Sequence, residues 1–366
     1  MNRIFILLIT GFFLGVLAFS CGCGTAASEA KKGEGDSSKM SGADSLSPQK
    51  WLASLTHQIK MNPNNYALYN DRSEVYMKLD SLAAAIRDVE KAISINDSIS
   101  DTHYLRGFYA CIQKDTVRAV QELKKAMELG TINAEVPYQL GQIYLMQKNY
   151  GEAEELFNLA IRRDTSQAIY YFAKGFLYHQ KKDGITALPF YKQSLKKDST
   201  FTKSYVQLYS LYTDVLKNED LANEQVEKLL KISPLHPLGN YYKAKKLFGD
   251  ATRLKVLIKK EPFMEAMAKS AVAFSDAIRG DSNFVQAYYE RGYTYFLMDK
   301  HNEAIKDFEK TVALDKNYYQ AYFMLGSIHE YYKDNTTAIS FYKKAIEAKP
   351  DFKEAIYAVK ELGTKK

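Results

Sequence analysis

The sequence predicts an all-α protein built from stacked pairs of antiparallel helices. Three observations support this prediction. A small residue, most often glycine, returns about every 34 residues from Tyr66 onward. In most units an alanine follows it at a spacing of twelve, and a large apolar residue follows the alanine at a spacing of four. A fixed period of this length is typical of a chain that repeats one supersecondary unit.

The recurring small residue marks the first helix of each unit. Glycine costs a helix about 1 kcal/mol relative to alanine, so its return at a fixed spacing indicates that a neighbouring backbone lies close. A large residue, usually tyrosine, follows three positions later and therefore shares the same helix surface. The small position holds Ser73, Gly107, Gly141, Gly175, Tyr209, Ala244, Gly292 and Gly326.

The recurring alanine marks the second helix. From the alanine, apolar or small residues stand at i, i+4 and i+7, which is one face of a helix. Polar turns such as residues 147–149 separate the two helices of a unit. The alanine position holds Ala85, Ala119, Ala153, Ala187, Ala222 with one residue inserted, Ser270, Ala304 and Ala338, and the large residue after it is Val89, Leu123, Phe157, Tyr191, Val226, Phe274, Phe308 or Tyr342.

This combination of period, small residue, tyrosine, alanine and large apolar residue resembles the tetratricopeptide repeat. The resemblance covers residues 66–352. It implies a right-handed superhelical solenoid of about eight helix pairs with terminal capping helices. The predicted repeats span residues 66–99, 100–133, 134–167, 168–201, 202–236, 237–284, 285–318 and 319–352.

Two predicted repeats depart from the pattern. We also expect a capping helix at each end of the array. Tyr209 occupies the small position of the fifth repeat. The sixth repeat is about fourteen residues too long and holds an insertion at 249–262, which is a second candidate contact surface. Because the ends of a solenoid need a polar outer face, we expect a capping helix within 48–65 and another within 353–366.

The first residues resemble a bacterial lipoprotein signal peptide. Arg3 precedes an apolar run that is short for a membrane span and ends at Cys21, the expected site of lipid attachment. We therefore expect a signal peptide at 1–20, a polar tether at 21–47 and a lipid anchor in the bacterial cell envelope. Gly22 stands where an aspartate would favour the inner membrane, so the outer membrane is preferred. An ordinary cleaved signal, and hence simple secretion, is the alternative.

The sequence contains no recognisable catalytic motif, so we expect no enzymatic activity, no metal and no cofactor. The six histidines are scattered and lack the spacing of metal ligands. The net charge of +7 comes from interspersed lysines and acids, which is no footprint for nucleic acid. Cys111 lies among apolar neighbours and is expected to be a buried thiol. Clustered carboxylates with perturbed pKa values would instead favour an enzyme.

The resemblance also implies that positions 2, 5, 9 and 12 of each first helix line a concave groove. We expect this groove to bind a segment of another envelope protein through aromatic anchors. The alternatives are rings that only pack against adjacent repeats, or a carrier of an apolar small molecule or glycan. Asn70, Glu74 and Met77 do not supply the lysine and asparagine clamp that some relatives use for a terminal carboxylate. The predicted groove residues are Tyr104, Phe108, Tyr138, Gln142, Phe172, Phe176, His179, Tyr241, Phe248, Tyr289, Tyr293, Phe296 and Phe323.

Overall fold

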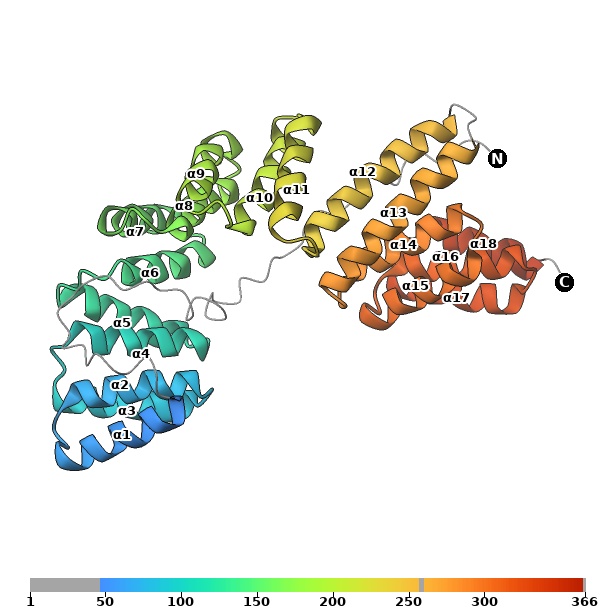
Figure 1. The fold of residues 1–366 in the computed structure, drawn as a ribbon. Coiled ribbons are helices and arrows are strands. Elements are labelled where there is room, and N and C mark those ends of the chain that lie inside the picture. Colours follow the sequence, from blue (N-terminus) through green and yellow to red (C-terminus); the bar gives the residue numbers. More distant parts are fainter. Residues whose placement is uncertain (1–46, 257–259, 365–366) are drawn as a thin grey trace. The chain divides into compact units, whose positions relative to one another are not determined.

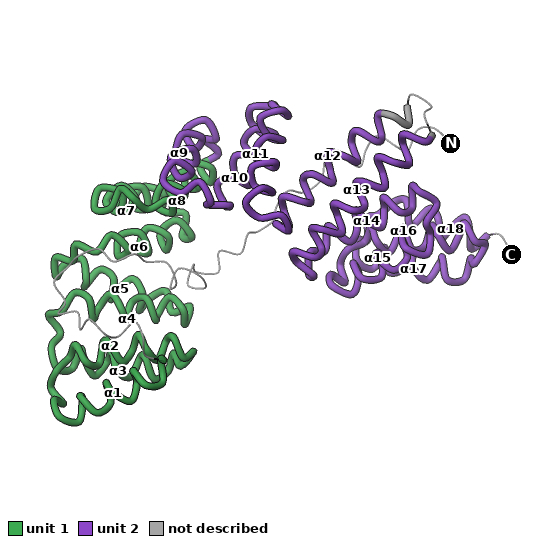
Figure 2. Tube along the Cα trace, viewed as in Figure 1, with its two compact units in different colours: residues 1–181 green, residues 182–366 purple. Residues whose placement is uncertain are grey.

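The structure, a computed structural model, describes residues 47–256 and 260–364 (Figure 1). All regular secondary structure in these ranges is helical, as predicted. The predicted signal peptide, Cys21 and all but the last residue of the predicted tether lie outside the described residues. None of the helices within these ranges combines the length and the apolar character needed to cross a membrane. The chain divides into two compact units, residues 1–181 and residues 182–366 (Figure 2).

The first unit consists of helix pairs that follow one another along the chain. Helices α2, α4 and α6 each pack against the next helix in sequence, because short turns leave antiparallel neighbours side by side. A single helix, α1, precedes the first pair. The helices are α1 (Pro48–Met61), α2 (Tyr66–Lys78), α3 (Leu82–Ile95), α4 (Ser100–Ile112), α5 (Thr116–Glu128), α6 (Glu135–Met146), α7 (Tyr150–Arg163) and α8 (Ala168–Gln180).

The second unit continues the same order and ends with the single helix α18 (Lys353–Thr364). It contains one π-helix, η3 (Leu211–Val215), between α10 and α11. The remaining helices are α9 (Gly184–Lys197), α10 (Thr202–Ser210), α11 (Glu219–Ile232), α12 (Pro237–Val256), α13 (Lys260–Gly280), α14 (Val285–Leu297), α15 (His301–Leu314), α16 (Tyr319–Tyr331) and α17 (Asn335–Ala348).

In four of the repeats the glycine of the first helix lies directly against the large residue of the second helix. A Cβ atom added to Gly141 would come within 2.8 Å of Phe157 Cε1. At Gly326 the same test gives 2.6 Å to Tyr342 Cε1. Phe157 is 0% exposed, so its ring has little freedom to move away. Packing of the two helices therefore offsets the intrinsic cost of glycine, and the predicted close approach is confirmed.

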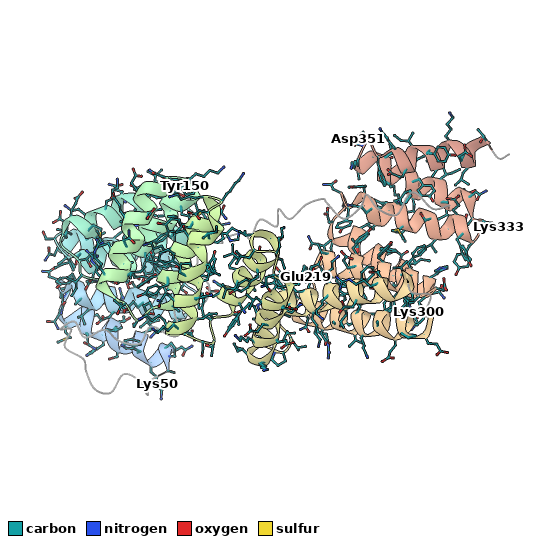
Figure 3. All side chains as sticks on the ribbon, turned by 90° about the horizontal axis from the view of Figure 1, so that it is seen from above. Lys50, Tyr150, Glu219, Lys300, Lys333 and Asp351 are labelled. Carbon is teal, nitrogen blue, oxygen red and sulfur yellow. The ribbon has the colours of Figure 1, made fainter. Side chains whose placement is uncertain are left out.

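The turn between first and second helix has one backbone form that recurs along the chain. At Lys148 φ is +60°, and the next residue, Asn149, donates its N–H to the carbonyl of Tyr144 at 2.8 Å. This is the left-handed helix end that satisfies the last carbonyl groups. Lys333, labelled in Figure 3, ends α16 in the same way. The non-glycine residues with positive φ in the described ranges are Asp80, Lys114, Lys148, Lys182, Lys217, Asp299 and Lys333.

The fifth predicted repeat absorbs its extra residue in the π-helix. Leu216 donates its N–H to the carbonyl of Leu211 at 3.0 Å, five residues back. A π turn holds one residue more than an α turn, so it restores the register before the turn at Lys217. Tyr209, which replaces the small residue, stacks its ring on Tyr242 of α12 with centroids 3.9 Å apart.

The sixth predicted repeat accommodates its insertion by lengthening both helices. Helix α12 has 20 residues against 13 in α14, and α13 has 21 against 14 in α15. Each helix therefore gains seven residues, close to two turns at about 3.6 residues per turn. Ala251, Phe263 and Met267 of the longer helices are buried together with Met298. Ser270, in the alanine position, donates its hydroxyl to the carbonyl of Ala244 at 2.9 Å.

Candidate functional site

In the first unit, the first helices of neighbouring repeats form one continuous face. Asn70 Nδ2 of α2 donates to Thr102 Oγ1 of α4 at 2.7 Å. Ser73 Oγ and Tyr109 Oη, also on α2 and α4, lie 2.9 Å apart. These bonds join the two helices side by side. The positions predicted to line a groove therefore lie on adjacent helices.

The predicted groove residues of the first unit differ in how accessible they are. Tyr104 and Phe108 on α4 are half-buried, with ring centroids 6.3 Å apart. Tyr138 on α6 is buried; its ring lies 5.1 Å from that of Tyr170, and its hydroxyl accepts a hydrogen bond from Gln142 Nε2 at 2.7 Å. The ring of Tyr138 therefore serves packing between α6 and α8.

Helix α8 carries the other three predicted groove residues of this unit. Phe172 and Phe176 stack with centroids 6.2 Å apart and planes at 19°. Phe172 is only 4% exposed, whereas Phe176 and His179 are half-buried. The accessible part of this helix is thus the turn that holds Phe176 and His179.

In the second unit, three of the predicted residues form a ladder of half-buried rings. Phe248 on α12 lies 6.0 Å from Tyr293 on α14, and Tyr293 lies 6.4 Å from Phe296. Lys245 Nζ, one turn before Phe248, pairs with Glu290 at 2.8 Å. The ladder therefore crosses from one first helix to the next beside a neutralised charge pair.

The other predicted residues of this unit contribute mainly to packing. Tyr241 is buried and contacts Phe274 and Phe284. Tyr289 lies 4.9 Å from Tyr318, and burial raises its pKa well above the usual range. Phe323 packs between Tyr342 and Phe352. These rings join the first helices to their neighbours. Tyr241 is buried, whereas Tyr289 and Phe323 are half-buried, like the rings of the ladder.

The ring ladder continues into residues that the sequence analysis missed. Phe296 stacks on His301 with centroids 5.6 Å apart, and His301 lies 4.9 Å from Tyr331. His301 Nδ1 is 3.0 Å from the hydroxyl of Tyr332. Tyr331 is 69% exposed and Tyr332 is 57% exposed. Both tyrosines follow position 12 of their first helix, so the family positions alone could not identify them.

Two surface hollows lie away from the predicted groove. One, of about 350 Å³, has an apolar floor of Leu140, Tyr144, Leu156 and Leu159 between α5 and α7. The other, of about 420 Å³, is floored by Leu208 and lies between α9 and α11. None of the predicted groove residues lines either hollow. Neither hollow therefore supports a carrier that would use the aromatic groove.

Charged residues buried between paired helices have structural partners. Arg72 makes two bonds of 2.7 Å to the carboxylate of Asp88, and Arg291 makes bonds of 2.8 and 2.7 Å to Asp307. Burial raises the pKa of Asp307, and its guanidinium partner opposes the shift. Within the described ranges no group of three or more histidines, cysteines or acids could hold a metal ion. These carboxylates are therefore components of the helix contacts.

Family models of the tetratricopeptide repeat match residues 66–98, 112–174, 285–318 and 319–352. The matched ranges contain the helix pairs α2–α3, α6–α7, α14–α15 and α16–α17. The chain contains tetratricopeptide repeats. Such repeats generally bind other proteins or peptides and have no catalytic chemistry of their own.

Three solved structures are similar to this chain in fold. A human IFIT1 dimer with m7Gppp-AAAA is 16% identical over 86% of this chain and 77% of that one, with a TM-score of 0.52. A tetratricopeptide repeat protein from Parabacteroides merdae is 20% identical over 74% of this chain and all of its own, with a TM-score of 0.46. YrrB, described as a tetratricopeptide repeat protein with an unusual peptide-binding site, is 19% identical over 52% of this chain and 98% of that one, with a TM-score of 0.44. At these identities the likeness concerns the fold alone.

Proposed function

We propose that this protein is a membrane-tethered scaffold that binds other proteins of the bacterial cell envelope through its tetratricopeptide repeats. The observation that supports the proposal most directly is the ring ladder of Phe248, Tyr293 and Phe296, which is half-buried and so open to a ligand on one side. Its extension, Tyr331 and Tyr332, is the most exposed aromatic surface of the second unit outside the capping helix. A contiguous apolar surface of this kind typically marks an interaction site.

Aromatic anchors are suited to this role for a physical reason. A ring presents a large apolar area but has few rotatable bonds, so binding costs little side-chain entropy. Partner side chains that cover Tyr293 and Phe296 would also exclude water from them. We therefore expect a few of these rings to provide most of the affinity for an extended or helical segment of the partner.

The tether is the second part of the proposal. The apolar run after Arg3 and the position of Cys21 support a lipid-modified N-terminus, and the polar residues up to 47 would connect it to the repeats. Gly22, which stands where an aspartate would favour the inner membrane, supports an outer-membrane location. Cys21→Ser should move the protein from the membrane pellet to the soluble fraction, and mass spectrometry of the mature N-terminus should detect acyl chains only on the unchanged protein. A mature N-terminus that begins elsewhere and carries no lipid would contradict the tether.

Crosslinking in intact cells tests the binding function. We expect Phe248→Ala combined with Tyr293→Ala to lose most captured partners, because both anchors lie in the ladder. Tyr357→Ala is the matched control, since this ring is 66% exposed on α18 and lies outside the ladder. Circular dichroism should show that both variants stay folded. Unchanged capture by the folded double variant would exclude the ladder as the binding surface.

A further inference from the structure

The first helices of the two N-terminal repeats carry three carboxylates that form no ion pair among the described residues. Asp71 and Glu74 are three residues apart on α2, so they are neighbours on one helix surface. Asp101 lies in the first turn of the adjacent α4. All three residues are exposed, and none forms an ion pair with another of the residues that the structure describes. This surface of α2 and α4 therefore presents negative charge to solvent.

These carboxylates destabilise one another in their ionised form. Surrounding protein raises the pKa of Glu74, although its side chain can be reached by solvent. The charges of Asp71 and Asp101 raise the same pKa further, and only Lys78 opposes them. Surrounding protein also raises the pKa of Asp71. A cation bound among the three groups would relieve this repulsion.

A buried amide beside these carboxylates lacks a hydrogen-bond donor. Asn70 is 9% exposed and precedes Glu74 by one turn on the same face of α2. Its Nδ2 donates to Thr102, the residue after Asp101. Its Oδ1 is buried and has no hydrogen-bond partner among the described residues. Buried acceptors are normally paired, so this corner of the molecule has an excess of acceptors. We call Asn70, Asp71, Glu74 and Asp101 the acidic inner face.

Aromatic rings border the acidic inner face on α4. Tyr104 and Phe108 are half-buried, with ring centroids 6.3 Å apart, and stand one and two turns after Asp101. Ring faces attract ammonium and guanidinium groups, and carboxylates nearby strengthen that attraction. The same groups repel a carboxylate. The chemistry is therefore opposite to that of a clamp for the C-terminus of a peptide.

We propose that the acidic inner face and the rings beside it bind a lysine- or arginine-bearing segment of a partner protein. This inference rests on the proposed binding function and adds the chemistry of the partner. The chain as a whole carries a net charge of +7, so its overall field repels a cationic segment. Affinity for such a segment must then come from a local site.

A peptide titration with the mature full-length protein tests the inference. The probes are three fluorescent heptapeptides with capped ends, which carry three arginines, three citrullines or three glutamates. Citrulline keeps the shape of arginine and removes its charge. We expect the arginine peptide to bind at least tenfold more tightly than the citrulline peptide, and the glutamate peptide not to bind. Equal affinity for the arginine and citrulline peptides would overturn the inference.

Two matched variants locate the site. Asp71→Asn combined with Glu74→Gln removes two charges from the acidic inner face and should weaken the arginine peptide at least tenfold. Glu128→Gln combined with Glu155→Gln removes two exposed charges from second helices of the same unit and should change its affinity less than twofold. Equal weakening by both pairs would show a general charge effect and contradict a local site.

The peptide titration and the crosslinking experiment report on different claims. If partners are captured in cells but the titration shows no preference for arginine, the acidic inner face is not a cationic site. The proposed binding function would still stand. No captured partner would count against the proposed function. A preference for arginine that depends on Asp71 and Glu74 would still establish the cationic site.

Discussion

Two helix pairs of the second unit, α14–α15 and α10–α11, solve the same packing problem differently. In α14–α15, a Cβ atom on Gly292 would lie 3.0 Å from Phe308 Cε1, so glycine permits the close approach of the helices. In α10–α11 the equivalent residue is Tyr209, whose ring turns away to stack on Tyr242 of the next repeat. A small side chain is thus one means of packing the pair. Redirecting a large one toward the neighbour is another.

The residues that precede these contact positions also differ between the two helix pairs. Arg291 and Asp307 form a buried ion pair between α14 and α15. Their counterparts are Leu208, which is 1% exposed, and Gln225, which is 6% exposed. The regular pair therefore combines a glycine contact with a charged link, whereas the irregular pair has neither and contains a π turn. Helix pairing therefore tolerates either set of contacts, but we expect mutations to destabilise the two pairs by different amounts.

The largest expected effect is the loss of the ring that fills the regular pair. Phe308→Ala should lower the free energy of unfolding by about 3–5 kcal/mol, because Phe308 is 0% exposed and its removal leaves a cavity. Val226→Ala, at the equivalent place in α11, should cost about 1–2 kcal/mol, since fewer atoms are removed. Urea denaturation followed by circular dichroism measures both. Equal losses of unfolding free energy in the two variants would contradict the expected difference between the two helix pairs.

A smaller effect should follow from breaking the charged link. Arg291→Met should cost about 3 kcal/mol, because it leaves Asp307, whose side chain is 7% exposed, without its partner. Adding Asp307→Leu should recover most of this loss and make α14–α15 resemble α10–α11. The same denaturation experiment checks both variants. A double variant no more stable than Arg291→Met would mean that the ion pair itself stabilises the fold.

Placing valine at the small position should separate the pairs again. Gly292→Val should cost about 2 kcal/mol, since its side chain would overlap Phe308 and Asp307. Tyr209→Val should cost about 1 kcal/mol, the typical value of a stacked aromatic pair. Thermal unfolding monitored by circular dichroism compares the two. A greater loss at Tyr209 would show that the redirected ring, and not the small residue, is the stronger constraint.

The smallest expected effect concerns how the helix after each pair begins. His236 Nδ1 accepts the N–H of Gly239 at the start of α12, and burial lowers the pKa of His236 below 6.5. The neutral form is thus favoured in the folded state. Its contribution, about 1 kcal/mol, is present above pH 6.5 and is lost as the pH falls through the lowered pKa.

A matched variant isolates this titration. His236→Asn keeps an acceptor that does not titrate, so it should remain more stable than the unchanged protein at pH 5 and equal to it at pH 7.5. Urea midpoints at the two pH values provide the measurement. Helix α16, which follows α14–α15, begins without a side-chain cap and offers no such group. If the urea midpoint of both proteins changes equally between pH 5 and pH 7.5, His236 is not the cause of the pH dependence of stability.

The helix pairs could be predicted from the sequence because their packing is periodic. The contacts of Gly141 with Phe157 and of Gly326 with Tyr342 follow from spacing alone. The extra residue before Ala222 was visible as a slip in register. The sequence did not predict that the backbone would accommodate this residue in a π turn, because a longer loop or a shifted turn would preserve the same spacing.

The candidate site was predictable only in part. The family positions include Tyr293 and Phe296, which remain accessible, but also Tyr138 and Tyr241, whose burial depends on rings of neighbouring helices. The same positions include Asp101, which is not aromatic and was therefore not predicted as an anchor. The acceptor excess at Asn70 depends on which atom reaches Thr102, and a sequence does not contain that information.

The seven-residue extensions of α12 and α13 have a consequence for how such arrays can be altered. Because seven residues are close to two full turns, the extension changes how far a hairpin reaches without rotating its side chains relative to the core. The length of a helix pair can therefore change in this chain while the orientation of its side chains relative to the core stays the same. Excising one block of seven from each helix should produce a standard-length module, and transplanting the same blocks into α14 and α15 should project their ends about 10 Å outward.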